Sequence, residues 1–227
     1  MTYLMVILLI LLIIFGPQYW VNFVFKKYDS VLYHMPGNGK QLTEHLLSYY
    51  KFREVQITSS TDGDYFNPKD LTLNLHLERG SKNTLTSIVV AAHEVGHVIQ
   101  YYENNIWFKL RQQLAKSATS LNKVSSVFIL LIPFVTLITR SPTIGFLFFL
   151  FGFSGMILNV LLHLVTLPVE FDASFNKALP ILKSGEYITT EQEKAAKQIL
   201  QAAALTYISA ALANLLNIGR WLTALRR

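Results

Sequence analysis

Four blocks of apolar residues alternate with polar segments along the chain. They lie at residues 3–25, 124–139, 144–167 and 199–216. A helix needs about 20 apolar residues to cross the hydrocarbon core of a bilayer. We therefore expect the first three blocks to span a membrane, the second and third as a hairpin turning at Arg140-Ser141-Pro142. The fourth block is rich in Ala and either spans or packs against the other helices.

The first apolar block is expected to stay in the protein as an anchor. No basic residue precedes it, and the sequence GPQYW at residues 16–20 makes a poor signal-peptidase site. Lys26 and Lys27 follow it, and basic residues beside a membrane helix favour the cytoplasmic side. The sequence thus predicts a multi-pass protein of the cell membrane whose catalytic unit faces the cytoplasm.

Residues 28–122 have the pattern of a small α+β unit. Apolar residues recur at helical spacing over 41–52, and leucines alternate strictly with polar residues over 71–77. The first pattern predicts a helix and the second a half-buried strand with one wet face. A short strand is expected over 53–58 and a helix over 84–103.

The chain as a whole is predicted to be a mainly α membrane protein with three to four transmembrane helices and this small α+β unit. Three parts are expected: an N-terminal anchor, the α+β unit and a helical membrane region, at residues 1–27, 28–122 and 123–227.

Composition narrows the possible chemistry. Apolar residues make up 52% of the chain and charged residues only 15%, which is typical of a membrane protein. Cys is absent, so a transition metal would have to be bound by His and carboxylate side chains. The net charge of +6 suits basic residues that flank membrane helices. Because no dense run of Lys and Arg occurs, we expect no binding to nucleic acid.

The segment HEVGH, from His93 to His97, carries the clearest chemical signal. Two His residues four apart project from one face of a helix and can bind one zinc ion. Glu94 lies beside the first His, where it can act as a general base without being a ligand. This pattern on a helix is typical of zinc peptidases. Gly96 costs a helix interior about 1 kcal/mol relative to Ala, which close packing of another backbone would explain.

These residues alone do not identify the third metal ligand. A catalytic zinc site usually has three protein ligands and one open position. The candidates are the acids that follow the hairpin and four other histidines, His34, His45, His76 and His163. Among the acids is Glu170, which follows Pro168, a residue expected to break or restart the helix. An acid at the end of a membrane helix needs a partner, unless it is an ordinary interfacial carboxylate.

Three stretches, DYFNPKDLTLNLHL, VVAAHEVGHVIQ and TLPVEFDAS, resemble the YugP-like neutral zinc metallopeptidases of bacterial membranes. The likeness spans nearly the whole chain. It implies a zincin-like unit of the gluzincin type, in which a Glu on a later helix completes the site. By this resemblance one Zn²⁺ per chain is bound by His93, His97 and Glu170, and Glu94 is the general base.

One position departs from the gluzincin pattern. Gluzincins often carry an acid four residues after the ligand Glu, which orients the first His. Ser174 stands there in this chain. Asp172 is acidic but lies only two residues after Glu170, so it should point elsewhere on a helix.

The leading hypothesis is a membrane-bound zinc metallopeptidase that hydrolyses peptide bonds by zinc-activated water. Its partners would be the lipid bilayer and a peptide or protein substrate. Two alternatives stay open: an intramembrane zinc protease, and a non-catalytic zinc-stabilised membrane scaffold or chaperone. Glu94 argues against the scaffold, because a structural metal site does not need that acid. Asn74 and His76, on the predicted strand, are either a substrate-pairing edge or a solvated face.

Topology provides a further test of the predicted site. His93 and Glu170 can meet only if an even number of membrane spans separates them. The predicted hairpin supplies two.

Overall fold

The computed structural model describes residues 2–32 and 37–225, and 76% of the chain is helical. The chain forms two compact units. The hairpin unit comprises Met1–Ile14, Ile106–Leu167 and Tyr207–Arg227, and the α+β unit comprises Phe15–Asn105 and Pro168–Thr206. The predicted division at residues 27 and 122 follows composition, and it stays a prediction.

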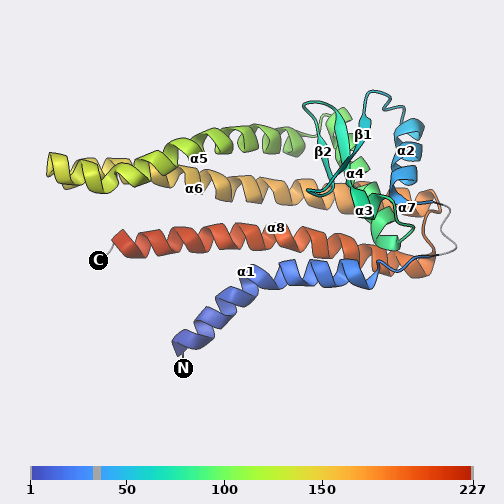
Figure 1. Ribbon diagram of the computed structural model, residues 1–227, viewed down its shortest axis with the longest axis horizontal. Coiled ribbons are helices and arrows are strands. Elements are labelled where there is room, and N and C mark those ends of the chain that lie inside the picture. Colours follow the sequence, from blue (N-terminus) through green and yellow to red (C-terminus); the bar gives the residue numbers. More distant parts are fainter. Residues whose placement is uncertain (1, 33–36, 226–227) are drawn as a thin grey trace. The chain divides into compact units, whose positions relative to one another are not determined.

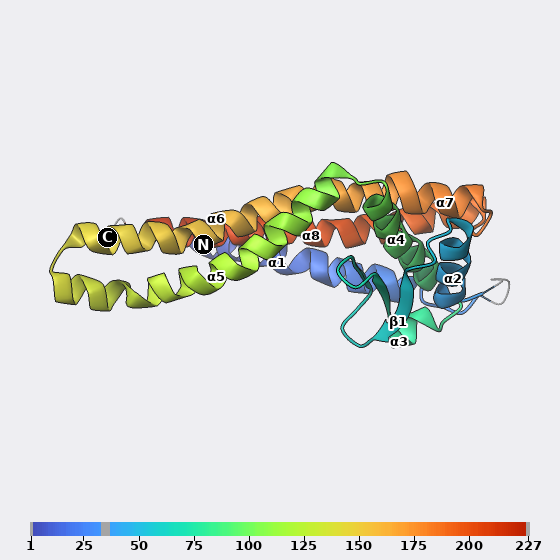
Figure 2. The same ribbon diagram turned by 90° about the horizontal axis from the view of Figure 1, so that it is seen from above.

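The elements are shown in Figure 1 and Figure 2. In chain order they are α1 (Thr2–Lys27), α2 (Gly39–Tyr49), β1 (Gln56–Ser60), β2 (Tyr65–Asn67), β3 (Thr72–His76), α3 (Leu77–Gly80), α4 (Leu85–Tyr102), α5 (Ile106–Thr139), α6 (Pro142–Phe171), the π-helix η1 (Asp172–Ala178), α7 (Leu179–Ser184) and α8 (Thr190–Leu225).

A three-stranded sheet with the order β1-β3-β2 forms one part of the α+β unit. β3 pairs parallel with β1 and antiparallel with β2. The predicted half-buried strand is confirmed as β3, where Leu73 and Leu75 are buried. Leu77 continues the alternation in sequence but is 59% exposed and begins α3 instead. β2 was not predicted, because three residues inside a turn-rich stretch are too few to show a period of two.

Helix α4 is the central element of the α+β unit and confirms the helix predicted over 84–103. It begins after Thr84, whose side-chain hydroxyl accepts a hydrogen bond from the Ser87 amide (3.2 Å). Such an N-cap satisfies one of the amides that a helix leaves unbonded. α4 packs against α2, the sheet and η1, so most of its residues are buried. Its apolar side chains at 0% exposure are Val89, Ala92, Val95 and Val98.

Helix α2 confirms the helix predicted over 41–52, although it starts earlier, at Gly39. Asn38 and Gln41 form a capping box, with reciprocal hydrogen bonds of 2.9 Å between each side chain and the other residue's amide. The Gly39 amide donates to Ser87 Oγ (3.1 Å). The start of α2 is therefore attached directly to the first turn of α4.

The expected break at Pro168 is wrong, because α6 runs on through this residue to Phe171. Proline removes one amide donor from a helix interior, so the carbonyl four residues earlier loses its partner. Here the chain absorbs this loss without ending the helix, and it then widens into η1. A π-helix bonds each carbonyl five residues ahead, and such segments occur often at functional sites.

The predicted hairpin is confirmed as α5 and α6, which lie side by side in Figure 1 and Figure 2. α5 begins at Ile106, well before the apolar block at 124, since the polar residues ahead of it also favour a helix. Among the described residues, Ile106–Thr139 and Pro142–Ser184 are long and apolar enough to cross a membrane. Spanning by the first and fourth apolar blocks stays a prediction.

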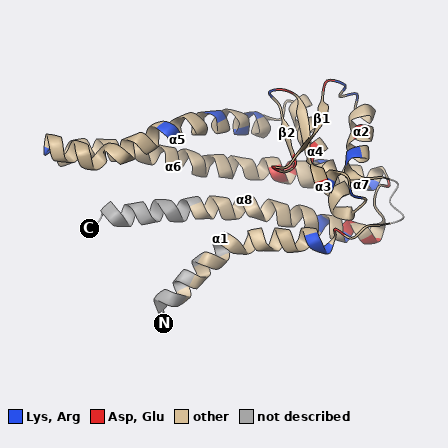
Figure 3. Ribbon diagram, viewed as in Figure 1, with Lys and Arg blue, Asp and Glu red and all other residues tan. Residues whose placement is uncertain are grey.

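The apolar parts of this hairpin are mostly uncovered by protein. In the most apolar 18-residue windows of the two helices, only 6% and 28% is buried. The core helix of a soluble protein would be mostly buried. In Figure 3 the positive residues of α5 lie in its first half and at the turn with α6, and the stretch between them has none. This is the pattern expected of helices surrounded by lipid.

Small and polar side chains hold α5 and α6 together. Asn122 and Asn159 exchange two amide hydrogen bonds of 3.0 Å, and Ser125 Oγ donates to the Phe151 carbonyl (3.3 Å). A Cβ on Gly155 would lie 2.6 Å from Ser125 Oγ and 2.9 Å from its Cβ. Small residues let membrane helices approach closely, and hydrogen bonds between them replace those that lipid cannot offer.

We predict that Gly155→Leu separates α5 from α6. Overpacking of this kind costs about 1–3 kcal/mol, so the thermal unfolding midpoint in detergent should fall. The matched control is Ile157→Leu, because Ile157 is 45% exposed on the same helix and its replacement should change little. Equal midpoints for both variants would contradict the observed contact.

Candidate metal centre

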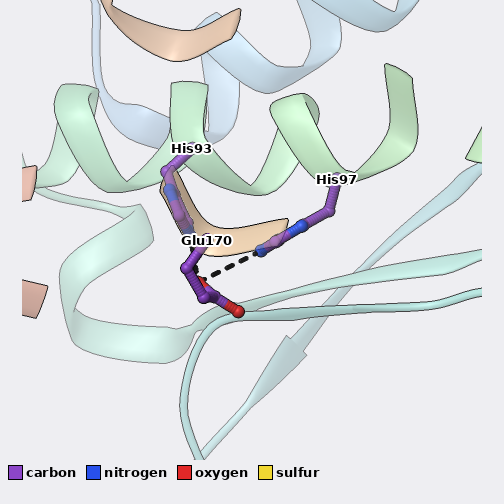
Figure 4. Close-up of side chains that lie close together, drawn as sticks. All are labelled: His93, His97 and Glu170. Atoms are coloured by element: carbon purple, nitrogen blue, oxygen red, sulfur yellow. Dashed lines mark ion pairs between the residues drawn. The ribbon is translucent and has the colours of Figure 1, made fainter. Parts of the chain in front are cut away.

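His93, His97 and Glu170 converge within the α+β unit, as Figure 4 shows. The two imidazoles come from successive turns of α4, and the carboxylate comes from the last turn of α6. Glu170 Oε2 lies 3.2 Å from His93 Nε2 and 3.6 Å from His97 Nε2. One potential ligand atom from each residue lies within 4.8 Å of the others. The segments that carry His93 and Glu170, before and after the hairpin, therefore come together, as the sequence argument required.

The two distances to Glu170 Oε2 fit a small tetrahedral cation. Metal–ligand distances near 2.05 Å with tetrahedral angles place two ligand atoms about 3.3 Å apart. The observed 3.2 and 3.6 Å bracket that value. Two imidazole nitrogens and one carboxylate oxygen are also a donor set that zinc accepts. The residues present therefore fit a zinc ion with one open position.

The Glu170 carboxylate is almost completely buried, with 2% of the residue exposed, and it lies beyond the apolar stretch that ends at Leu167. Burial by itself would raise its pKa. The positive charge and hydrogen bonds that His97 and His93 can provide outweigh burial and hold the pKa of Glu170 well below its usual value. The site thus favours an ionised carboxylate, the form that binds a metal.

Glu94 follows His93 on α4 and is 6% exposed. One residue along an α-helix is a rotation of about 100°. Its side chain therefore leaves the helix on a neighbouring face to the two His side chains. Glu94 is not one of the three described residues whose potential ligand atoms come together.

Gly96 explains how η1 comes so close to α4. A Cβ at this position would lie 2.8 Å from the Ala173 carbonyl oxygen and 3.3 Å from Ala173 Cα. Ala173 is completely buried at the start of η1. The expected close approach of another backbone is therefore confirmed. It brings the turn that carries Glu170 against the turn that carries His93 and His97.

A second set of polar side chains lies behind the two imidazoles. Ser174 Oγ is 3.1 Å from His93 Nδ1, so the position that departs from the gluzincin pattern still contacts the first His. Gln100 Oε1 is 2.9 Å from His97 Nδ1. Gln100 Nε2 donates to Asp172 Oδ2 (2.8 Å), and Asp172 thus faces away from His93, as its spacing predicts.

The sequence interpretation missed Gln100. The available signal was its position three residues after His97 on the same helix, where side chains meet. A polar residue in an otherwise apolar stretch, VIQ, was the second hint.

The other histidines do not join this group. Within the described ranges, His93, His97 and Glu170 are the three residues that come together as potential metal ligands. His45 stacks edge-on against Tyr187. The His76 amide donates to Asp64 Oδ1 (2.7 Å) at the end of β3. His163 lies on α6 in the hairpin unit, and His34 lies outside the described residues.

Of the two interpretations of Asn74 and His76, the substrate-pairing edge is wrong, because β3 is the central strand and both its edges are occupied. The Asn74 side chain is also engaged, since it accepts a hydrogen bond from Thr58 Oγ1 (2.5 Å). The strand at the edge beside α4 is β2. Its Phe66 packs edge-on against Tyr101 of α4 (centroids 5.7 Å apart).

Comparison with known proteins agrees with this geometry. Residues 3–226 match the model of a family described as "Putative neutral zinc metallopeptidase". The chain belongs to this family. It is also 30% identical over 212 residues to a Bacillus subtilis (strain 168) protein described as "Putative membrane protease YugP", a match that covers 91% of this chain and 90% of that protein. No solved structure matches the chain.

Membership of this zinc metallopeptidase family confirms the resemblance seen in the sequence. His93, His97 and Glu170 of this family member lie close enough together to bind one metal ion. The relative's description as a membrane protease accords with the two apolar helices of the hairpin unit.

We predict that Gly96→Val pushes η1 away from α4. A side chain at this position meets backbone atoms that cannot rotate aside, so the cost should reach about 2 kcal/mol or more. Zinc content measured by elemental analysis should fall together with the thermal unfolding midpoint. Gly96→Ala should show the same changes to a smaller extent. A variant that is as stable and as rich in zinc as the parent chain would contradict the close contact.

Proposed function

We propose that this protein is a membrane-bound zinc-dependent peptidase that hydrolyses peptide bonds at the centre formed by His93, His97 and Glu170. One observation carries the proposal: three side chains that can bind a metal converge, with one potential ligand atom of each within 4.8 Å of the others, around the HEVGH helix of a zinc metallopeptidase family member. One zinc ion per chain fits three protein ligands and one open position.

When bound, zinc would acidify a water molecule and polarise the scissile carbonyl. The protein's own residues supply the remaining steps. Glu94 accepts the proton from the attacking water on its carboxylate and later delivers it to the nitrogen of the leaving amine. His93, His97 and Glu170 keep their positions throughout. Because Glu94 and Glu170 are nearly buried, their charges act in a medium that screens them less than water does.

The substrate is expected to be an extended peptide or protein segment. Among the described residues β2 is an edge strand of the sheet and packs against α4, and we propose that the substrate pairs with its outer edge as a further strand. Pairing of this kind binds a peptide through its backbone and leaves sequence preference to side-chain pockets.

We infer that the protein is a multi-pass membrane protein whose α+β unit faces the cytoplasm. Lys26 and Lys27 follow the first apolar block, and further lysines surround the segment after the hairpin. Basic residues near membrane helices favour the cytoplasmic side. The site would then act on segments close to the inner membrane surface.

An intramembrane protease is the less favoured alternative. Among the described helices, α4 does not meet the length and composition of a membrane span. It is surrounded by α2, the sheet and η1 instead of by lipid. A zinc-stabilised scaffold without catalysis is the remaining alternative, and Glu94 is the residue that distinguishes it.

We predict that Glu94→Gln retains zinc and loses peptide hydrolysis by about 10²–10⁴-fold, the usual contribution of a general base. The amide keeps the size of the side chain but cannot accept the proton. Hydrolysis of a quenched fluorescent peptide and zinc content would be measured on the same detergent-purified samples. Full activity in this variant would favour the scaffold or a different base.

We also predict that Glu170→Ala loses most of the zinc, because the site is left with two protein ligands. The matched control is Glu103→Ala, which removes a surface carboxylate whose side chain is 51% exposed. The control should retain about one zinc per chain. Retention of zinc by Glu170→Ala would require a different third ligand.

The proposed orientation can be tested by cysteine labelling, since the chain contains no Cys. Lys69→Cys places a thiol on an exposed turn of the α+β unit, and Arg140→Cys places one at the turn of the hairpin. In intact spheroplasts, an impermeant maleimide should label Arg140→Cys at once but Lys69→Cys only after permeabilisation. The reverse pattern would place the α+β unit outside.

A further inference from the structure

Gln100 is a fully buried polar side chain, at 0% exposure, directly behind the candidate metal centre. Its carbonyl oxygen Oε1 lies 2.9 Å from His97 Nδ1. Its amide nitrogen Nε2 donates to the Val169 carbonyl (2.8 Å) and to Asp172 Oδ2 (2.8 Å). Both hydrogens of the amide and its oxygen are thus used. Because each of these groups has a hydrogen-bond partner, the amide can be buried without a large desolvation cost.

The two acceptors of Gln100 fix which way its amide points. A backbone carbonyl and a carboxylate both require a donor, so the NH₂ group must face them and Oε1 must face His97. Asp172 is itself held in place, because the Asn176 side chain donates to its other oxygen (2.9 Å). The rotated amide would set oxygen against two oxygens and is excluded by repulsion.

The orientation of Gln100 in turn selects one tautomer of His97. Because Oε1 can only accept a hydrogen bond, Nδ1 of His97 must carry the hydrogen. In the neutral ring, the other nitrogen, Nε2, then has its lone pair free on the side of Glu170 Oε2, which is 3.6 Å away. A metal ligand needs that lone pair, and the hydrogen bond at the opposite nitrogen sets the direction of the ring.

Gln100 also connects the two halves of the centre. Val169, whose carbonyl accepts from Gln100, is the residue directly before Glu170. A single side chain therefore holds the ring of one ligand on α4 and the backbone beside another ligand on α6. We propose that Gln100, supported by Asp172, is a positioning residue that fixes the tautomer of His97 and its alignment with Glu170 for metal binding.

This inference rests on the proposed function, because it assumes that His93, His97 and Glu170 bind a metal ion. Its tests measure zinc affinity and the tautomer of His97 and do not depend on peptide hydrolysis. Zinc affinity would be measured on the full chain in detergent by competition with a fluorescent chelator. Gln100→Met keeps the size of the side chain and removes all three hydrogen bonds. We expect it to weaken zinc binding by about 10–100-fold, the usual effect of such supporting residues. The matched control, Gln113→Met, alters an exposed Gln on α5 and should leave the affinity unchanged.

Exchange of the amide and carboxylate groups between Gln100 and Asp172 separates positioning from simple packing. Gln100→Glu keeps an acceptor for His97 but sets a carboxylate against the Val169 carbonyl and Asp172, so zinc affinity should fall. Adding Asp172→Asn supplies a donor to the new carboxylate and should restore part of the affinity. Asp172→Asn alone should lower the affinity less than Gln100→Met does, because Gln100 keeps the Val169 carbonyl as an acceptor. Absence of any rescue, or an unchanged affinity in Gln100→Met, would overturn the proposal.

A second measurement decides the case even if the variants do not fold. In the zinc-free parent chain with ¹⁵N-labelled histidine, NMR should show a hydrogen on His97 Nδ1, whether or not Nε2 carries a second one. Hydrogen on Nε2 instead would overturn the proposal. If the parent chain bound no zinc at all, the proposed function would fail, while this tautomer measurement would still support or overturn the role of Gln100.

Discussion

The close contact between α4 and η1 at Gly96 is the constraint on which the candidate centre depends. Two of the potential ligands lie on one helix, but the third lies more than 70 residues later, after the whole hairpin. Only a position without a side chain allows the Ala173 backbone to approach as closely as it does. That approach sets Glu170 and Ser174 opposite His93 and gives Gln100 access to Val169. The cost of glycine in a helix is thus offset by the assembly of the site.

Local sequence patterns predicted much of the fold for physical reasons that remain visible. Strict alternation over 71–77 became β3, because Leu73 and Leu75 pack on one face. Thr84 caps α4 where a polar turn meets an apolar run. The spacing of His93 and His97 follows from the helical repeat alone. These features depend on residues that are close together in the sequence, so local patterns are enough to predict them.

Features that depend on distant partners were not predictable from the sequence. β2 exists because its three residues pair with β3, and nothing in those residues specifies that partner. The continuity of α6 through Pro168 depends on the wider turn of η1 that follows. Glu170 was one of several open candidates until the family resemblance was considered, since a metal site is defined by three-dimensional proximity. Gln100 was missed for the same reason, because two of its three partners come from α6 and η1.

The polar atoms of this centre attract positive charge between Glu170 and the two imidazoles. When His97 is neutral with its hydrogen on Nδ1, its Nε2 lone pair faces the Glu170 carboxylate, and either a proton or a metal ion between the two atoms removes their repulsion. Burying a carboxylate to 2% exposure adds a desolvation cost of several kcal/mol. A positive charge between the three residues removes both penalties at once. Under the proposed function, a divalent ion would do so with one open position left for a water molecule.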